Sequence, residues 1–252
     1  MDIKDFVSEH FHHFNAGELR RCGSSLKEFL DGGGRLIITL AGAMSTAQIG
    51  RSLGPAIKSQ KIHAICCTGA NLEEDIFNLV ARSKYEEIDG WRQLSSTDEE
   101  ELRNRGMNRV TDVAIPEGAF REIEEKLMSL WQDAEEVGDR RFPHEYLYDL
   151  VNHGDLEFDI DSEKSWLACA ADANLPVFTP GWEDSTLGNI LAARVLDRTI
   201  KDSSIIKSGL DTMQALADWY REDDSPTGIL QVGGGIAGDF AISVVPMLRQ
   251  DV

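Results

Sequence analysis

Short apolar runs alternate with stretches of helical spacing along most of the chain. The apolar runs 35–41 and 62–67 are each followed by a helical pattern, at about 46–59 and 72–82. Two successive strand-then-helix units predict parallel strands joined by right-handed crossovers. Further patterns predict strands at 176–179 and 229–232, and helices at 118–137, 143–153, 162–173, 185–196 and 208–221.

The two ends and the middle of the chain are less regular. Apolar residues between 3 and 14 repeat at helical spacing, and Asn15-Ala-Gly17 is expected to end that helix. Ser25-Leu-Lys-Glu28 resembles a capping box that opens a short second helix. The polar segment 85–106 predicts a helix-containing excursion, and 239–249 fits a helix or an apolar strand. We therefore predict one α/β domain over 1–252, with a mostly parallel sheet and a helical insertion.

Composition narrows the function classes. The chain has 252 residues, 42% hydrophobic and 27% charged, which suffices for a sizeable core. Its net charge of −19 argues against a nucleic-acid partner. The same charge suits cationic substrates such as polyamines, although acidic chains without such substrates are common. No apolar run reaches the ~20 residues that span a bilayer, so no membrane partner is expected.

Cysteine and histidine positions give no metal or disulfide pattern. The four cysteines, of which Cys66 and Cys67 are adjacent, form no CxxC pair, and the six histidines show no ligand spacing. We therefore expect no metal site and a reducing, cytoplasmic location. On a strand, Cys66 and Cys67 would point to opposite faces.

Three polar loops each follow a short hydrophobic run: 68–75, 180–189 and 233–235. Open α/β sheets bind ligands at the carboxyl ends of their strands, so these loops are candidates for a nucleotide cofactor site. The glycine run 233–235 lets backbone approach a phosphate. Its extension GGGIAG fits GxGxxG formally, but only 14 residues follow Gly238, so the acid expected ~20 residues later is missing.

Acidic residues in two of these loops have two interpretations each. Glu73, Glu74 and Asp75 open a predicted helix, where they could bind ribose or an amine or simply stabilise the helix start. Asp184 could bind a cofactor or act as a helix N-cap. Trp182 could stack on a ring or pack internally.

Four segments together resemble deoxyhypusine synthase, and more closely its bacterial deoxyhypusine synthase-like relatives. They are Thr68-Gly-Ala-Asn-Leu-Glu-Glu-Asp75, Arg103-Asn-Arg-Gly-Met-Asn-Arg-Val110, Pro176-Val-Phe-Thr-Pro-Gly-Trp-Glu-Asp-Ser-Thr-Leu-Gly-Asn189 and Gln231-Val-Gly-Gly-Gly-Ile-Ala-Gly-Asp-Phe240. The resemblance implies a Rossmann-like fold and a homotetramer with NAD at subunit interfaces. It implies a transferase that passes the aminobutyl group of spermidine to an amine.

The resemblance also implies roles by position. Thr68, Gly69 and Ala70 match the family's NAD-contacting loop, and Asp184 matches an NAD-contacting aspartate. Glu74 matches a glutamate between cofactor and polyamine. Further cofactor contacts are expected from Ser45, Thr46 and Gly234, and substrate contacts from Glu73, Glu74, Asn189 and Asp239.

Three departures from the family pattern bear on activity. Asn189 stands where the synthase has an aspartate, and Asp239 stands where it has a histidine. We therefore expect a small diamine acceptor, as in homospermidine formation, at least as much as a protein lysine. The family's catalytic lysine, in a Trp-Gly-Lys context, lies beyond the position matching Val252, so the catalytic residue is unassigned.

The third departure leaves the function open at this point. We expect a shortened form with little or no turnover of spermidine. A catalytically silent NAD-binding or assembly protein is the main alternative, and an unrelated NAD hydrolase or deacylase is a third.

Overall fold

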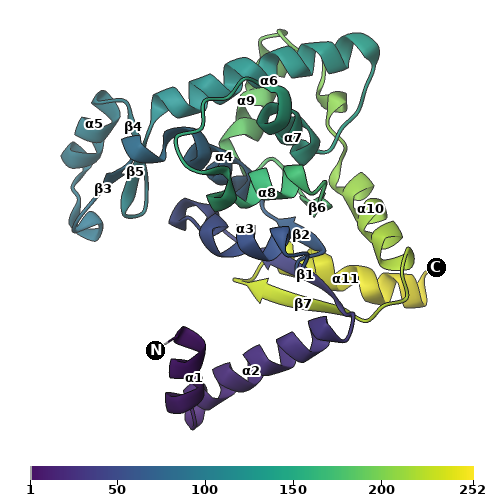
Figure 1. The fold of residues 1–252 in the computed structure, drawn as a ribbon. Helices are drawn as coiled ribbons and strands as arrows, with labels where there is room; N and C mark the ends of the chain where they lie inside the picture. Colours follow the sequence, from purple (N-terminus) through teal and green to yellow (C-terminus); the bar gives the residue numbers. More distant parts are fainter. Residues whose placement is uncertain (1) are drawn as a thin grey trace.

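A parallel sheet forms the centre of the computed structural model, which describes residues 2–252 (Figure 1). Its four strands lie in the order β6-β2-β1-β7 and all neighbours are parallel. The strands are β1 (Arg35–Leu40), β2 (Ala64–Cys67), β6 (Val177–Phe178) and β7 (Thr227–Val232). The parallel α/β arrangement predicted from the sequence is confirmed.

Helices cover both faces of this sheet because alternate strand residues are apolar on both sides. On one face, Ile38 and Cys67 pack in a large core with α3 (Gly50–Lys58), α4 (Gly69–Ala81) and α8 (Trp166–Asp172). On the other, Ile37 and Cys66 pack against α10 (Gly209–Arg221) and α11 (Ile236–Gln250). The two adjacent cysteines thus face opposite cores, as the strand pattern predicted.

The larger core extends away from the sheet into further helices. These are α6 (Glu117–Val137), α7 (Pro143–His153) and α9 (Thr186–Leu196), which lie above α4 and α8 in Figure 1. Short 3-10 turns link the elements: η1 (Met44–Ala47), η2 (Arg82–Lys84), η3 (Trp91–Gln93), η4 (Ser162–Lys164) and η5 (Ser203–Ile205). Helix α4 is buried along nearly its whole length.

The N-terminal prediction was wrong in its boundaries. The chain forms α1 (Ile3–His10) and a long α2 (Phe14–Asp31), so Asn15–Gly17 begins a helix instead of ending one. A Cβ at Gly17 would lie 2.7 Å from the carbonyl oxygen of His12, so this glycine permits a tight turn before α2. The expected capping box at 25–28 lies inside α2. Figure 1 shows both helices as an arm below the sheet.

The excursion after α4 contains more than the predicted helix. Its helix is α5 (Ser96–Asn104), and beside it lies a small antiparallel sheet in the order β3-β5-β4. The strands are β3 (Glu86–Glu87), β4 (Met107–Val110) and β5 (Val113–Pro116), too short to show alternation in the sequence. The ambiguous segment near the C-terminus is the helix α11. Within residues 2–252, no helix combines the length and apolarity of a membrane span.

Candidate functional site

The loops that leave the four parallel strands meet along the carboxyl edge of the sheet. The amide of Ala41, after β1, donates to the carbonyl of Val232 at the end of β7 over 3.0 Å. A Cβ at Gly233 would lie 2.9 Å from that of Ala41, so the β7 loop passes directly beside the β1 loop. The amide of Thr68, after β2, donates to the carbonyl of Leu40 over 3.2 Å. One continuous edge therefore connects three of the strand ends.

Asp184 connects the fourth strand end to this edge. Its Oδ1 accepts a hydrogen bond of 2.8 Å from the amide of Gly69, in the first turn of α4. A Cβ at Gly69 would lie 2.7 Å from that oxygen and 3.0 Å from Cδ1 of Trp182. Only glycine permits this approach. Burial raises the pKa of Asp184, and the Gly69 amide partly offsets that shift.

Glu73 holds the start of α9. Its Oε1 accepts from the amide of Thr186 over 2.9 Å, and its Oε2 accepts from the amide of Leu187 over 2.8 Å. The free amides at a helix start favour a carboxylate. Burial raises the pKa of Glu73, and these two backbone donors oppose the rise. Both oxygens of Glu73 are therefore committed to the fold.

Asp75 does the same for α8. Its Oδ2 accepts from the hydroxyl of Ser165 and, over 3.0 Å, from the amide of Leu167. Burial raises the pKa of Asp75 to about 6, against these hydrogen bonds. Glu73 and Asp75, the first and last of three adjacent acidic residues, therefore each anchor a neighbouring helix.

Glu74, between them, is the exception. Its side chain is 5% exposed, and its Oε2 has no hydrogen-bond partner among residues 2–252. Burial raises its pKa to about 7, while the nearby Thr46 hydroxyl lowers it and the charge of Glu73 raises it further. The buried Oγ1 of Thr46 is also without a partner in the same described part of the chain. A buried carboxylate oxygen without a hydrogen-bond partner destabilises the fold, so its presence points to a role in binding.

The glycine turn after β7 offers bare backbone. Gly233 and Gly235 have φ angles of 80° and 70°, a region that favours glycine. A Cβ at Gly234 would meet no atom within 4 Å, so the middle of this turn is open. Such a turn can bring backbone close to a bulky anionic ligand.

A family model for deoxyhypusine synthase matches residues 8–252. The chain belongs to the deoxyhypusine synthase family. Among curated relatives it is 24% identical to the "Deoxyhypusine synthase-like protein" of a Cyanothece species, over 99% of this chain and 63% of that protein. It is also 24% identical to "Probable deoxyhypusine synthase 1" of Archaeoglobus fulgidus, over 92% of this chain and 69% of that protein. The chain thus spans roughly two thirds of these relatives.

Solved structures share the fold. A "putative deoxyhypusine synthase" from Entamoeba histolytica superposes with a TM-score of 0.54 at 14% identity, covering 80% of this chain and 60% of that one. A "conserved putative LOR/SDH protein" from Methanococcus maripaludis gives 0.51 at 12% identity, over 93% of this chain and 55% of that one. The Rossmann-like fold expected from the resemblance to deoxyhypusine synthase is consistent with both.

The residues assigned by resemblance to deoxyhypusine synthase differ in how much of each side chain is free. Ser45 is fully buried: its hydroxyl accepts from Nε1 of Trp166 over 2.9 Å and donates to Oδ1 of Asn71 over 3.1 Å. Thr68 caps α4, and its hydroxyl donates to the carbonyl of Gly42 over 2.6 Å. Ala70 is half-buried beside it. Ser45 and Thr68 therefore shape the edge through hydrogen bonds within the chain.

The two residues at which this chain departs from the family pattern are both exposed. Nδ2 of Asn189 donates to the carbonyl of Ser185 over 2.6 Å, in the first turn of α9. Asp239 lies in the first turn of α11, directly after the glycine turn. Asn189 and Asp239 thus lie in the first turns of two helices that follow strand-end loops.

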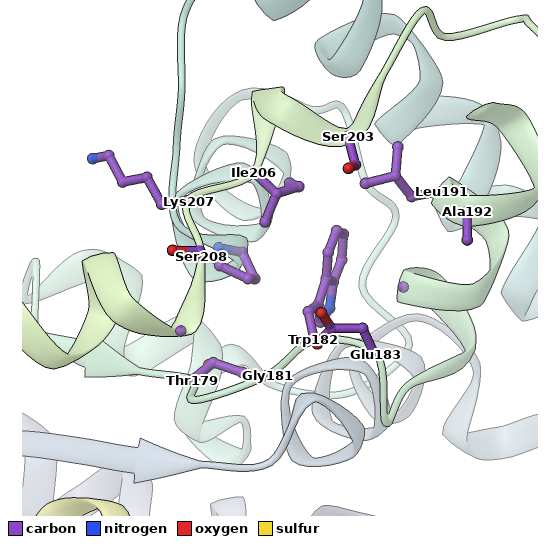
Figure 2. A pocket seen from close by; sticks show the side chains of 13 residues that line it. Thr179, Gly181, Trp182, Glu183, Leu191, Ala192, Ser203, Ile206, Lys207 and Ser208 are labelled. Atoms are coloured by element: carbon purple, nitrogen blue, oxygen red, sulfur yellow. The ribbon is translucent and has the colours of Figure 1, made fainter.

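A cavity of about 290 Å³ borders the loop after β6. Figure 2 shows the ring of Trp182 standing among Leu191, Ser203 and Ile206, with the amine of Lys207 pointing outward. Trp182 is 5% exposed and meets Trp131 edge-to-face at 5.9 Å. The indole therefore packs within the core and presents only part of its surface to the cavity.

Sequence reasoning missed the buried amides behind the edge. Asn71 and Asn78 lie seven residues apart, on one face of the apolar helix α4. Nδ2 of Asn78 donates to the carbonyl of Ser45 over 2.6 Å, while Asn71 contacts the β1 loop. Two asparagines at that spacing in an otherwise apolar helix could have indicated buried hydrogen bonds to a neighbouring loop, because buried amides need partners.

Proposed function

We propose that this protein transfers an aminobutyl group from a polyamine such as spermidine to an amine acceptor, with NAD as cofactor. The observation that carries the proposal is the buried Glu74 carboxylate, whose Oε2 has no partner within residues 2–252. Its two acidic neighbours both anchor helices, so Glu74 alone is free to meet a ligand. An amine of a polyamine supplies the positive charge and hydrogen-bond donors that this carboxylate lacks.

The carboxyl edge suits NAD. The open Gly234 turn would face its phosphates, and Asp184, with Oδ2 outside the Gly69 contact, could accept from a ribose hydroxyl. NAD, when bound, supplies a hydride acceptor for the carbon next to the polyamine nitrogen. The residues present therefore fit the group in kind. By resemblance to the family, we propose a homotetramer with these sites at subunit interfaces.

Glu74 would orient the donor polyamine and hold its proton. The pKa of its carboxyl is about 7 in the free chain, so near neutral pH it can exist in either state. A bound ammonium group favours the charged carboxylate and lowers that pKa. The buried Glu74 carboxylate can therefore hold and orient the ammonium group, and with its pKa near 7 before pairing it can take up a proton when the amine binds uncharged.

The proposed transfer breaks one carbon–nitrogen bond and forms another. The bond between the secondary nitrogen of spermidine and its butyl carbon breaks, and diaminopropane leaves. A new bond forms between that carbon and the acceptor nitrogen, which gives up one proton while the diaminopropane nitrogen gains one, so there is no net oxidation. Asn189 and Asp239 replace the charged aspartate and the histidine of the synthase, so we favour a small diamine acceptor over a protein lysine.

The test is to incubate the protein with NAD and spermidine and to offer putrescine or an acceptor protein separately. With the family's Trp-Gly-Lys segment supplied in the same chain, we expect diaminopropane release and homospermidine formation with putrescine, and loss of both in Glu74→Gln. Asp133→Asn, at an exposed position on α6, is the matched control and should behave as wild type. Transfer only to a protein lysine would reject the preferred acceptor. Undiminished transfer by Glu74→Gln would reject the role of Glu74.

A further inference from the structure

We propose that Asn71 is a positioning residue that turns the β1 loop so that two backbone amides face the cofactor's phosphates. This inference rests on the proposed NAD function and concerns a residue to which the family resemblance assigned no role. Asn71 lies in the first turn of α4 and is fully buried. It contacts the end of β1 and the start of η1 together.

The Nδ2 of Asn71 lies 2.7 Å from the hydroxyl oxygen of Thr68 and within hydrogen-bond distance of three consecutive carbonyls. Its Nδ2 lies 3.1 Å from the carbonyl oxygen of Leu40, 3.2 Å from that of Ala41 and 2.8 Å from that of Gly42. Its Oδ1 accepts from the amide of Ser45 over 3.0 Å. One side chain thus fixes both ends of the turn between β1 and η1.

Peptide geometry determines the direction in which the backbone amides of the β1 loop point. In a planar trans peptide, the carbonyl of one residue and the N–H of the next point in opposite directions. The carbonyls of Ala41 and Gly42 face Asn71, so the amides of Gly42 and Ala43 face away from it. Within residues 2–252, neither amide donates a hydrogen bond. These two donors are therefore available to a ligand.

The local conformation is that of an anion-binding turn. Gly42 has a φ of 55°, in the left-handed region, and it is exposed. Successive amides around a left-handed residue form a concave site for anions. The β7 glycine turn lies alongside, since a Cβ at Gly233 would lie 2.9 Å from that of Ala41. Two backbone stretches of this edge, one fixed by Asn71 and one glycine-rich, are thus adjacent.

Asn78 separates this role from simple support of the fold. It is buried on the same helix and donates to the carbonyl of Ser45 over 2.6 Å, but it makes no hydrogen bond to residues 40–42 in the described chain. Asn78→Ala therefore removes a comparable buried amide and leaves the orientation of the β1 loop in place. It is the matched control for Asn71→Ala.

The experiment combines affinity, stability and amide resonances of the full chain. Wild type, Asn71→Ala and Asn78→Ala are each titrated with NAD, ADP-ribose and adenosine by calorimetry, and their melting temperatures are recorded. We expect both variants to have a lower melting temperature than wild type. Only Asn71→Ala should lose about tenfold or more in NAD and ADP-ribose affinity, as for lost hydrogen bonds to a charged group.

Nuclear magnetic resonance makes the test independent of how well the variants fold. In wild type, NAD and ADP-ribose should shift the amide protons of Gly42 and Ala43, and adenosine should not. Unmoved amides on NAD binding, or a folded Asn71→Ala with wild-type NAD affinity, would overturn the inference while leaving the proposed function standing. A wild-type chain that binds no NAD would overturn both.

Discussion

The Oδ1 of Asp184 accepts a 2.8 Å hydrogen bond from the amide of Gly69, although the two residues are 115 positions apart. The contact joins the loop after β6 to the first turn of the helix after β2. It also explains why residue 69 is a glycine, since a Cβ there would lie 2.7 Å from the accepting oxygen. The carboxyl edge of the sheet is held together by such contacts between loops.

Replacing Asp184 should separate its two tasks. Asp184→Ala removes the acceptor for the Gly69 amide and should lower the free energy of unfolding by about 1 kcal/mol, as for a typical hydrogen bond. Asp184→Asn keeps an oxygen acceptor for the Gly69 amide, so this variant should retain most of the stability. It should nevertheless bind NAD more weakly than wild type, because the carboxylate is lost. Urea unfolding and NAD calorimetry measure the two effects. Equal loss of stability in both variants would contradict this division.

Glu73 and Glu74 should respond in opposite ways to the same substitution. Glu73→Gln places an amide group against a backbone N–H of α9 and should destabilise the protein by about 1–3 kcal/mol. Glu74→Gln removes a buried carboxylate whose Oε2 has no partner in the described chain, so it should stabilise the protein at pH 8. Chemical unfolding at that pH measures both. Destabilisation by Glu74→Gln at pH 8 would show that the carboxylate is satisfied.

The stability difference at Glu74 should depend on pH. Its folded-state pKa is about 7, above the ordinary 4.5, so the folded state favours the protonated form. Stability is then lost as pH rises from about 4.5 through 7, by up to about 3 kcal/mol for this shift. The advantage of Glu74→Gln should accordingly grow between pH 5 and pH 8. A difference that stays constant over this range would refute the raised pKa.

Polyamine affinity should follow the same titration in the opposite direction. Above pH 7 the Glu74 carboxyl is charged and can pair with an ammonium group, while spermidine remains cationic. Spermidine binding to the NAD-saturated protein should therefore strengthen as pH rises from 6 to 8. Calorimetry with Glu74→Gln as control, which should give a flat profile, checks the source of the dependence.

Gly234→Ala tests the glycine turn without straining it. A Cβ at this position meets no atom within 4 Å, and Gly234 does not share the positive φ of its neighbours. The melting temperature should therefore stay unchanged, whereas a methyl group in the path of the cofactor should weaken NAD binding several-fold. Wild-type affinity in this variant would place the cofactor elsewhere.

The sequence predicted the parallel strands and the polar loops that follow them, because buried strands and helix periodicity leave strong local patterns. It predicted a second helix that was too short, because Gly17, inside α2, marks a close approach to His12 and not a helix end. The strands β3, β4 and β5 have only two to four residues, too few for a pattern.

The site was predictable as loops but not as individual roles. Glu73, Glu74 and Asp75 are adjacent in sequence and chemically alike, and only their partners on α9 and α8 distinguish them. Those partners lie more than 90 residues away for Asp75 and more than 110 for Glu73, so no local pattern records them. Likewise, the commitment of Ser45 to Asn71 and Trp166 depends on packing of distant segments.

Hydrogen exchange with and without NAD tests the central claim most directly, because it reports on each loop of the carboxyl edge separately. We predict that NAD slows amide exchange in the loops after all four parallel strands, at 41–46, 68–70, 181–185 and 233–235. Exchange in the helix α2 at 14–31 should not change. Protection confined to that helix, or no protection anywhere at saturating NAD, would contradict a cofactor site at this edge.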